Sequence, residues 1–190
     1  SVFMTILFNK IMLFFVGAIV FGLFCTLSFY FSRKFSWGPV DVLMPESTFN
    51  FLKKTIIIGM AVFIVLASCV FGILIAKSWQ TVLKFFNSSD FGLNEPILNK
   101  DVSFYILKLP FYELVHNWIL TAILVIFVGS IIVYFVNYTF RGMTFKFNSG
   151  LKIHSSILLA LLMITVSFGH FIQRWKIIYG SGDIISGASF

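Results

Sequence analysis

Four long stretches of this chain contain no Asp, Glu, Lys or Arg, and each is long enough to cross a lipid bilayer. They cover residues 11–32, 55–76, 114–140 and 153–173. The hydrocarbon core of a membrane is spanned by about 20 consecutive apolar residues in helical form. We therefore predict an all-α fold, a polytopic membrane helical bundle. Its four transmembrane helices are expected over residues 11–31, 55–76, 118–138 and 155–172.

The composition argues against a separate soluble domain. Charged residues make up 11% of the chain, whereas about 25% is usual in soluble domains. We expect one membrane domain over residues 1–190. The net charge of +7 does not indicate a nucleic-acid partner, because the cations gather at the ends of the apolar runs, where they can contact lipid headgroups. These flanking cations are Lys10, Arg33, Lys34, Lys53, Lys54, Lys77, Arg141, Lys152 and Arg174.

The charges also suggest an orientation in the membrane. If the helices alternate in direction, the loops 33–54 and 141–152 share one side, and each side carries seven Lys or Arg residues. The two loops are short, however, and hold two acidic residues against five on the other side. A dense positive charge favours the cytoplasm. We therefore expect a plasma-membrane protein whose connection 77–117 and C-terminus are extracytoplasmic.

The connection 77–117 is predicted to contain short interfacial helices. Trp79, Val82, Leu83 and Phe86 recur at helical spacing and predict an amphipathic helix that ends at residues 87–90. Asp101 is placed to cap a second short helix over residues 102–109. Pro110 should end or kink that helix before the third transmembrane helix.

Small residues and cysteines within the apolar runs suggest helix packing. Ser68, Gly72 and Ala76 recur every four residues, and Ala18 and Gly22 have the same spacing in the first run. Such patterns allow two helices to approach closely. Cys25 and Cys69 are expected at different depths, too far apart for a disulfide, and we interpret both as small packing residues.

The sequence contains few candidates for chemistry. His170 lies within the last apolar run, so it is a candidate for a proton relay or ligand, although its nearness to the helix end also fits an interfacial role. Asp90 is a second candidate, with a turn role as the alternative. His116 and His154 are expected at the interface. These residues form no familiar catalytic or metal-binding motif, so we predict no cofactor and no metal site, and an enzymatic role is not favoured.

The connection also carries a specific pattern of short elements. These are Phe91-Gly92, Glu95-Pro96, Asp101, Phe104-Tyr105 and Leu109-Pro110-Phe111. The pattern resembles that of the bacterial and archaeal membrane proteins known as uncharacterised protein family 0182, with Glu95 in place of the commoner Asp. Arg174 and Gly187 are similar to later family positions. The resemblance implies an internal fragment of a larger parent, with about seven membrane helices followed by a large extracytoplasmic region, and it implies no activity.

Three functions remain open at this point. The first is a structural or scaffolding membrane core that anchors an extracytoplasmic region or partner and otherwise contacts the lipid bilayer. The second is a transporter or channel component with a path near His170 or the Ser68 and Gly72 positions. The third is a membrane enzyme that acts on lipid or envelope material through Asp90 or Asp101.

Overall fold

The computed structural model describes residues 2–35, 46–94, 98–140 and 149–176, and these residues fold almost entirely into helices. The four long ones are α1 (Val2–Phe35), α2 (Glu46–Lys77), α4 (Leu109–Phe140) and α5 (Ser149–Lys176). Each is long and apolar enough to cross a membrane. The predicted all-α fold with four membrane-spanning candidates is therefore confirmed.

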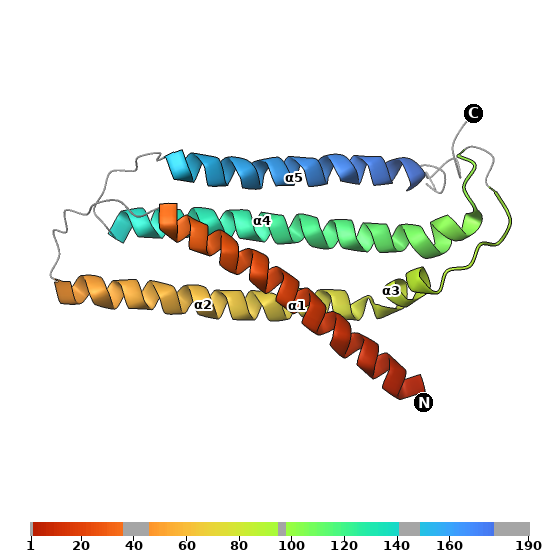
Figure 1. Ribbon diagram of the computed structural model, residues 1–190, viewed down its shortest axis with the longest axis horizontal. Coiled ribbons are helices and arrows are strands. Elements are labelled where there is room, and N and C mark those ends of the chain that lie inside the picture. The colour runs from red at the N-terminus through yellow and green to blue at the C-terminus, as the bar shows by residue number, and fades with distance from the viewer. Residues whose placement is uncertain (1, 36–45, 95–97, 141–148, 177–190) are drawn as a thin grey trace, which may run out of the picture.

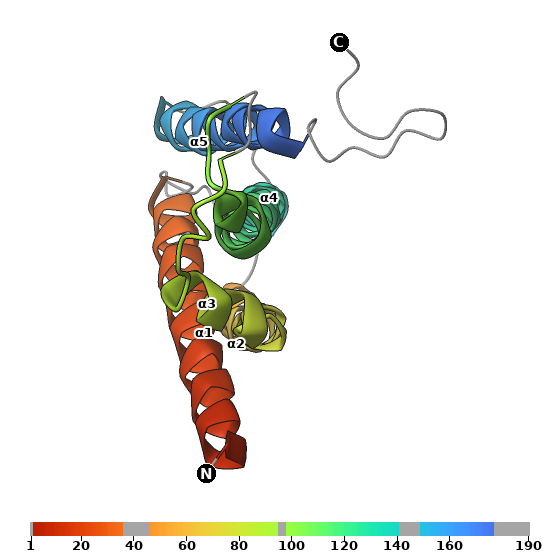
Figure 2. The same cartoon turned by 90° about the vertical axis from the view of Figure 1, so that its right-hand side faces the viewer.

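The long helices alternate in direction and form two layers. α2, α4 and α5 lie side by side in one layer, and α1 crosses one face of that layer at an angle (Figures 1 and 2). The C-terminal ends of α1 and α4 therefore lie toward the same end of the bundle as the N-terminal ends of α2 and α5 (Figure 1). This alternation agrees with the arrangement assumed in the prediction of orientation.

Every long helix extends beyond its predicted bounds. α1 begins at Val2 rather than at residue 11, and α5 begins at Ser149 rather than at residue 155. The prediction kept each helix within a charge-free run, because charges are costly in hydrocarbon. Nothing prevents a helix from continuing past the hydrocarbon into the headgroup region, where Lys and Arg are favourable.

The central core joins α1, α2 and α4 through aromatic side chains. The rings of Phe21 and Phe71 stack with centroids 4.0 Å apart. Trp118 meets Phe71 edge-on and donates its indole N–H to the Phe71 carbonyl oxygen at 3.2 Å. The interior of this core is apolar, and Trp118 satisfies its one donor within it.

The predicted small-residue contact is the crossing point of α1 and α2. A methyl group on Gly72 would lie 2.6 Å from the carbonyl oxygen of Phe14 and 3.1 Å from the Ala18 Cβ. A methyl group on Gly22 would lie 3.0 Å from the Ser68 hydroxyl. The two backbones approach this closely because these positions carry little or no side chain. The same packing means that α1 covers the Ser68 and Gly72 positions.

Large apolar side chains also cover the outside of the bundle. Leu66, Phe135 and Ile164 are 62%, 64% and 65% exposed. A water-soluble protein of this size rarely exposes so much contiguous apolar surface, so the pattern is consistent with contact with lipid. Cys25 is buried and Cys69 is exposed, and both are free thiols. Cys25 thus packs within the bundle as predicted, whereas Cys69 lies on the outer surface of the described residues.

The segment between α2 and α4 contains two short helical pieces. α3 (Trp79–Phe86) follows α2 after a turn at Ser78, as predicted. Its inward face differs from the prediction, because Val82 is buried and Phe85 packs against Phe111, whereas Phe86 is 74% exposed. Phe85 thus takes the inward position that the prediction gave to Phe86.

A π-helical turn, Phe104–Lys108, leads directly into α4. Of the two effects predicted for Pro110, an end or a kink of the short helix, the end is therefore wrong. Residues 102–140 are continuously helical, and Pro110 is the second residue of α4. The wider turn lets the Leu109 N–H bond to the Phe104 carbonyl oxygen. Pro110 follows directly, so its missing N–H falls where the regular α-helical hydrogen-bond pattern is already interrupted.

Candidate functional site

The described residues of the motif in the connection between α2 and α4 fold into one compact unit at one end of the bundle. We call the described residues 90–94 and 98–111 the motif segment. Its chain reverses so that Asn94 and Asp101 form an isolated antiparallel bridge, and the Val102 N–H donates to the Leu93 carbonyl oxygen at 2.9 Å. Beside α3, the segment runs into the first turn of α4 (Figure 1).

Asp101 is the centre of this unit. Its carboxylate accepts backbone N–H bonds from Phe91 at 3.1 Å, Gly92 at 2.8 Å and Ser103 at 2.7 Å. The bond from Ser103 is the predicted helix cap, whereas the other two bonds join the cap to a turn about ten residues earlier. A single side chain thereby connects both ends of the reversal.

These hydrogen bonds stabilise the charged form of Asp101. The pKa of its carboxyl group falls from the ordinary 3.8 to about 2. The largest cause is a hydrogen bond from the Ser103 hydroxyl, and the backbone N–H groups of Ser103, Phe91 and Gly92 act in the same direction. The Ser103 hydroxyl also lies 3.2 Å from Asp90 Oδ1 and can donate its single proton there instead.

The backbone conformation at position 92 explains why the motif has a glycine there. Gly92 has a φ of +72°, in the left-handed region that L side chains rarely adopt. This conformation turns the Phe91 and Gly92 N–H groups toward the same carboxylate. The Phe-Gly pair is therefore part of the Asp101 binding arrangement.

The aromatic residues of the motif attach the segment to neighbouring helices. Tyr105 and Leu109 are buried against Ile172 of α5. The Phe104 ring meets Trp175 of α5 at a centroid distance of 5.2 Å. On the other side, the Phe111 ring stacks on Phe85 of α3 at 4.1 Å. The motif segment thus packs between α3 and the end of α5.

Charged side chains complete the attachment at the end of α5. The Arg174 guanidinium lies 3.8 Å from the Phe171 ring centroid and 5.0 Å from that of Trp175. Lys176 forms an ion pair with Glu113 of α4 at 3.0 Å. Cation–π contacts and exposed ion pairs of this kind each contribute modestly, but here they act on the same helix end.

The remaining predicted site residues are spread over the surface. Asp90 is exposed and lies 3.3 Å from the Lys108 ammonium group. His170 is exposed on α5 and contacts Gln173 one turn away at 3.2 Å. The structure does not bring either residue beside the other. Glu95, Pro96 and Gly187 lie outside the described residues.

A second group of polar residues lies inside the bundle, and sequence reasoning did not find it. We call Ser28, Ser130, Tyr134 and His154 the buried polar cluster, and all four are 7% exposed or less. Ser28 Oγ lies 2.9 Å from Ser130 Oγ and 3.2 Å from His154 Nε2. His154 Nδ1 lies 3.0 Å from the Tyr134 hydroxyl. His154 lies near the start of α5 as expected, but its side chain does not face the interface, because the ring is buried and contacts Ser28 of α1 and Tyr134 of α4.

His116 is the matching histidine toward the other end of the α4 and α5 pair. Its Nε2 lies 2.9 Å from the Thr165 carbonyl oxygen of α5, so the ring joins the two helices by an Nε2–H donor. A methyl group on Gly169 would lie 2.6 Å from that nitrogen. Gly169 therefore makes room for the ring, and His116 acts as a helix-packing residue rather than a surface one.

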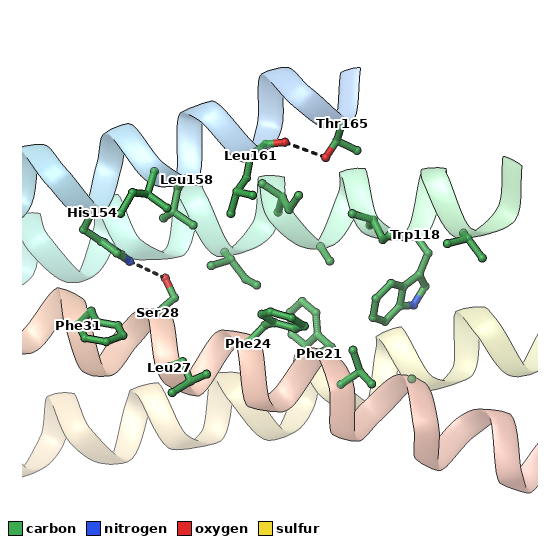
Figure 3. A pocket seen from close by; sticks show the side chains of 18 of the residues that line it. Phe21, Phe24, Leu27, Ser28, Phe31, Trp118, His154, Leu158, Leu161 and Thr165 are labelled. Carbon is green, nitrogen blue, oxygen red and sulfur yellow. Dashed lines mark hydrogen bonds between the residues drawn. The ribbon is translucent and has the colours of Figure 1, made fainter. Parts of the chain in front are cut away.

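A cavity adjoins the buried polar cluster. It has a volume of about 720 Å³ and lies between α1, α4 and α5, with Ile75 as its lining residue from α2. Ser28 and His154 lie at one end of it, and Trp118 lies toward the other (Figure 3). Nearly all of the remaining lining is apolar, including Phe21, Phe24, Leu158 and Leu161.

Together the four long helices and the docked motif segment define a polytopic helical membrane protein. More particularly, the chain belongs to the Uncharacterised protein family (UPF0182), whose sequence profile matches residues 1–190. This confirms the resemblance drawn from the motif.

Individual relatives agree with this assignment. A UPF0182 protein of Desulforamulus reducens is 34% identical over 119 residues, which is 61% of this chain and 13% of the relative. A UPF0182 protein of Sulfurovum sp. (strain NBC37-1) is 35% identical over 132 residues, or 68% of this chain and 14% of the relative. The chain therefore spans about one seventh of the curated relatives that it matches. No solved structure matches the chain.

Proposed function

We propose that residues 1–190 form one membrane domain that acts as a structural core, and that the motif segment is a platform for the extramembrane part of the full-length chain. The observation that carries this proposal is the Asp101 arrangement, in which one carboxylate holds three backbone N–H groups. So many fixed backbone groups make the segment an ordered surface instead of a simple connection.

The outward side of the motif segment supports this role. Leu93 and Ile106 of this segment and Phe86 of α3 are 66%, 54% and 74% exposed, and the same stretch of chain carries the exposed charges Lys84, Asp90 and Lys100. Protein-binding surfaces combine apolar groups at the centre with polar groups at the rim.

The location of the platform is also a proposal. We place the motif segment on the extracytoplasmic side of the plasma membrane, because the cation-dense loops belong to the opposite end of the bundle. An extracytoplasmic region of the same chain is therefore the partner that this platform reaches, and lipid covers the rest of the domain.

The test uses the full-length protein in membranes. Leu93→Asn changes the exposed surface only, and Asp101→Ala loosens the segment beneath it. We expect both variants to insert normally, and we expect the extramembrane region to become protease-sensitive. Asp90→Asn is the control, because that exposed carboxylate is 71% accessible and holds only weak contacts. An extramembrane region that stays folded and protected in both variants would refute the platform.

A further inference from the structure

We infer that the cavity between α1, α4 and α5 binds one acyl chain of a membrane lipid, with the acyl carbonyl oxygen at the Ser28 and His154 end. This is a ligand site additional to the platform, and it does not depend on the proposed function. Three properties of the cavity carry the inference: its size, its depth in the membrane and the uneven distribution of polar groups along it.

The size and shape of the cavity fit a narrow apolar ligand. Along α5 the lining runs from Ile153 to Thr165, a distance of about 18 Å at ~1.5 Å per residue. The cavity holds about 720 Å³, within the roughly 300–1,000 Å³ that is usual for pockets that bind small molecules. A hydrocarbon chain is the narrow apolar object that a bilayer supplies.

The depth places the polar end at the level of lipid esters. α5 has 28 residues and is thus about 42 Å long, close to the roughly 40–45 Å of a bilayer with its interfaces. His154 lies five residues after Ser149, or about 8 Å along the axis from that end. This is near the boundary between headgroups and hydrocarbon, where an acyl carbonyl is found.

The chemistry of the cavity matches the two parts of such a chain. Nearly all of its length is lined by apolar groups, such as Phe24, Ile126 and Leu161. At one end, Ser28 and His154 both line the space, and Ser28 Oγ lies 3.2 Å from His154 Nε2 (Figure 3). A hydroxyl or an imidazole N–H can donate to a carbonyl oxygen.

The neighbouring residues prepare this end. Ser130 and Tyr134 hold Ser28 and His154 from the side of α4, at 2.9 Å and 3.0 Å. The Phe31 and Phe35 rings flank the imidazole, each with its centroid 6.4 Å from that of His154. The donors therefore have a fixed position before any lipid binds, which lowers the entropy lost on binding.

The experiment uses the full-length protein in vesicles that contain a phosphatidylglycerol with a photoactivatable diazirine in its acyl chain. We expect cross-links in the wild type to peptides that contain Phe24 and Leu161. Ala122→Phe fills the cavity, since Ala122 is a buried lining residue, and should remove these cross-links. Leu161→Trp is a second variant for the case in which Ala122→Phe does not fold. Leu161 is 45% exposed, so a larger side chain there narrows the opening of the cavity and should weaken the same cross-links.

The control makes the same change on a different surface. Ala61→Phe lies on the exposed face of α2 and should leave the cross-links unchanged. For the polar end, Ser28→Ala should reduce the lipid that remains bound through purification, whereas Ser68→Ala at the α1–α2 crossing should not. Mass spectrometry of the extracted lipid separates a phospholipid from a free fatty acid.

Two results would overturn the inference. The first is cross-linking that is equally strong on all helix faces and insensitive to Ala122→Phe, which would mean ordinary annular lipid. The second is an absence of cross-links at Phe24 and Leu161 in the wild type, which would mean that lipid does not enter the cavity.

Discussion

Asp101 shows how much of the motif depends on one side chain. Phe91, Gly92 and Ser103 are brought together because their N–H groups share its carboxylate. The sequence predicted the Ser103 bond, because an Asp before a short helix is a common cap. It did not predict the bonds to Phe91 and Gly92, because those depend on a chain reversal that has no local periodicity.

Replacement of Asp101 should loosen the motif segment without disturbing the long helices. Asp101→Asn removes the charge and one acceptor oxygen from three backbone N–H groups. We expect hydrogen exchange of the Gly92 amide to become about tenfold faster, the order expected for losing one charge-assisted bond. The measurement is hydrogen exchange with mass spectrometry in detergent, and Asp90→Asn should give wild-type exchange. Equal effects of the two substitutions would argue against the special position of Asp101.

The lowered pKa of Asp101 predicts a pH dependence for the same segment. Because the pKa falls from 3.8 to about 2 on folding, this carboxylate stabilises the segment fully above pH 3.8. That contribution is lost as the pH falls through about 2. Exchange of the Gly92 amide, corrected for its intrinsic pH dependence, should therefore speed up between these values. The Asp101→Asn variant should show no such step, and a wild-type step centred near pH 4 or above would contradict the assigned hydrogen bonds.

At the level of helices, charge-free runs predicted which segments are long and apolar enough to span the membrane, and small residues predicted which faces of α1 and α2 can be approached closely by another helix. The buried polar cluster was not predictable in the same way. Ser130 and Tyr134 share a face of α4 at a spacing of four residues, which is a signal in retrospect. Ser28 and His154, however, are 126 residues apart, and periodicity alone does not say which helix faces meet. The predicted helices were also too short, because charged residues mark the edge of the hydrocarbon and not the end of the helix.

The close approach of α1 and α2 leaves no room for a larger side chain at Gly72. Gly72→Ala puts a methyl group 2.6 Å from the Phe14 carbonyl oxygen, so the helices must separate. Overpacking of this kind costs about 1–3 kcal/mol, and we expect a lower thermal unfolding temperature in detergent. Gly59→Ala is the matched control on the same helix, because a methyl group there meets nothing within 4 Å. A Gly72→Ala protein as stable as the Gly59→Ala protein would show that the crossing is looser than described.

For the whole molecule, the account joins a lipid-embedded bundle to an ordered platform at one end. The sequence was sufficient for the fold class and for the family, because hydrophobic length and the motif are both local features. The predicted orientation of the bundle in the membrane rests on a difference in charge density between two sides with equal numbers of cations. The proposed extracytoplasmic platform depends on this orientation more than on any other feature.

Topology mapping tests that feature directly. Single cysteines are introduced as Ser89→Cys and Ser149→Cys, in a full-length chain lacking Cys25 and Cys69. Both serines are exposed and belong to opposite ends of the bundle (Figure 1). Intact cells are treated with a membrane-impermeant thiol reagent, and permeabilised cells confirm that both sites react. We predict labelling from outside at position 89 only. Labelling at position 149 only would place the motif segment in the cytoplasm and contradict an extracytoplasmic platform.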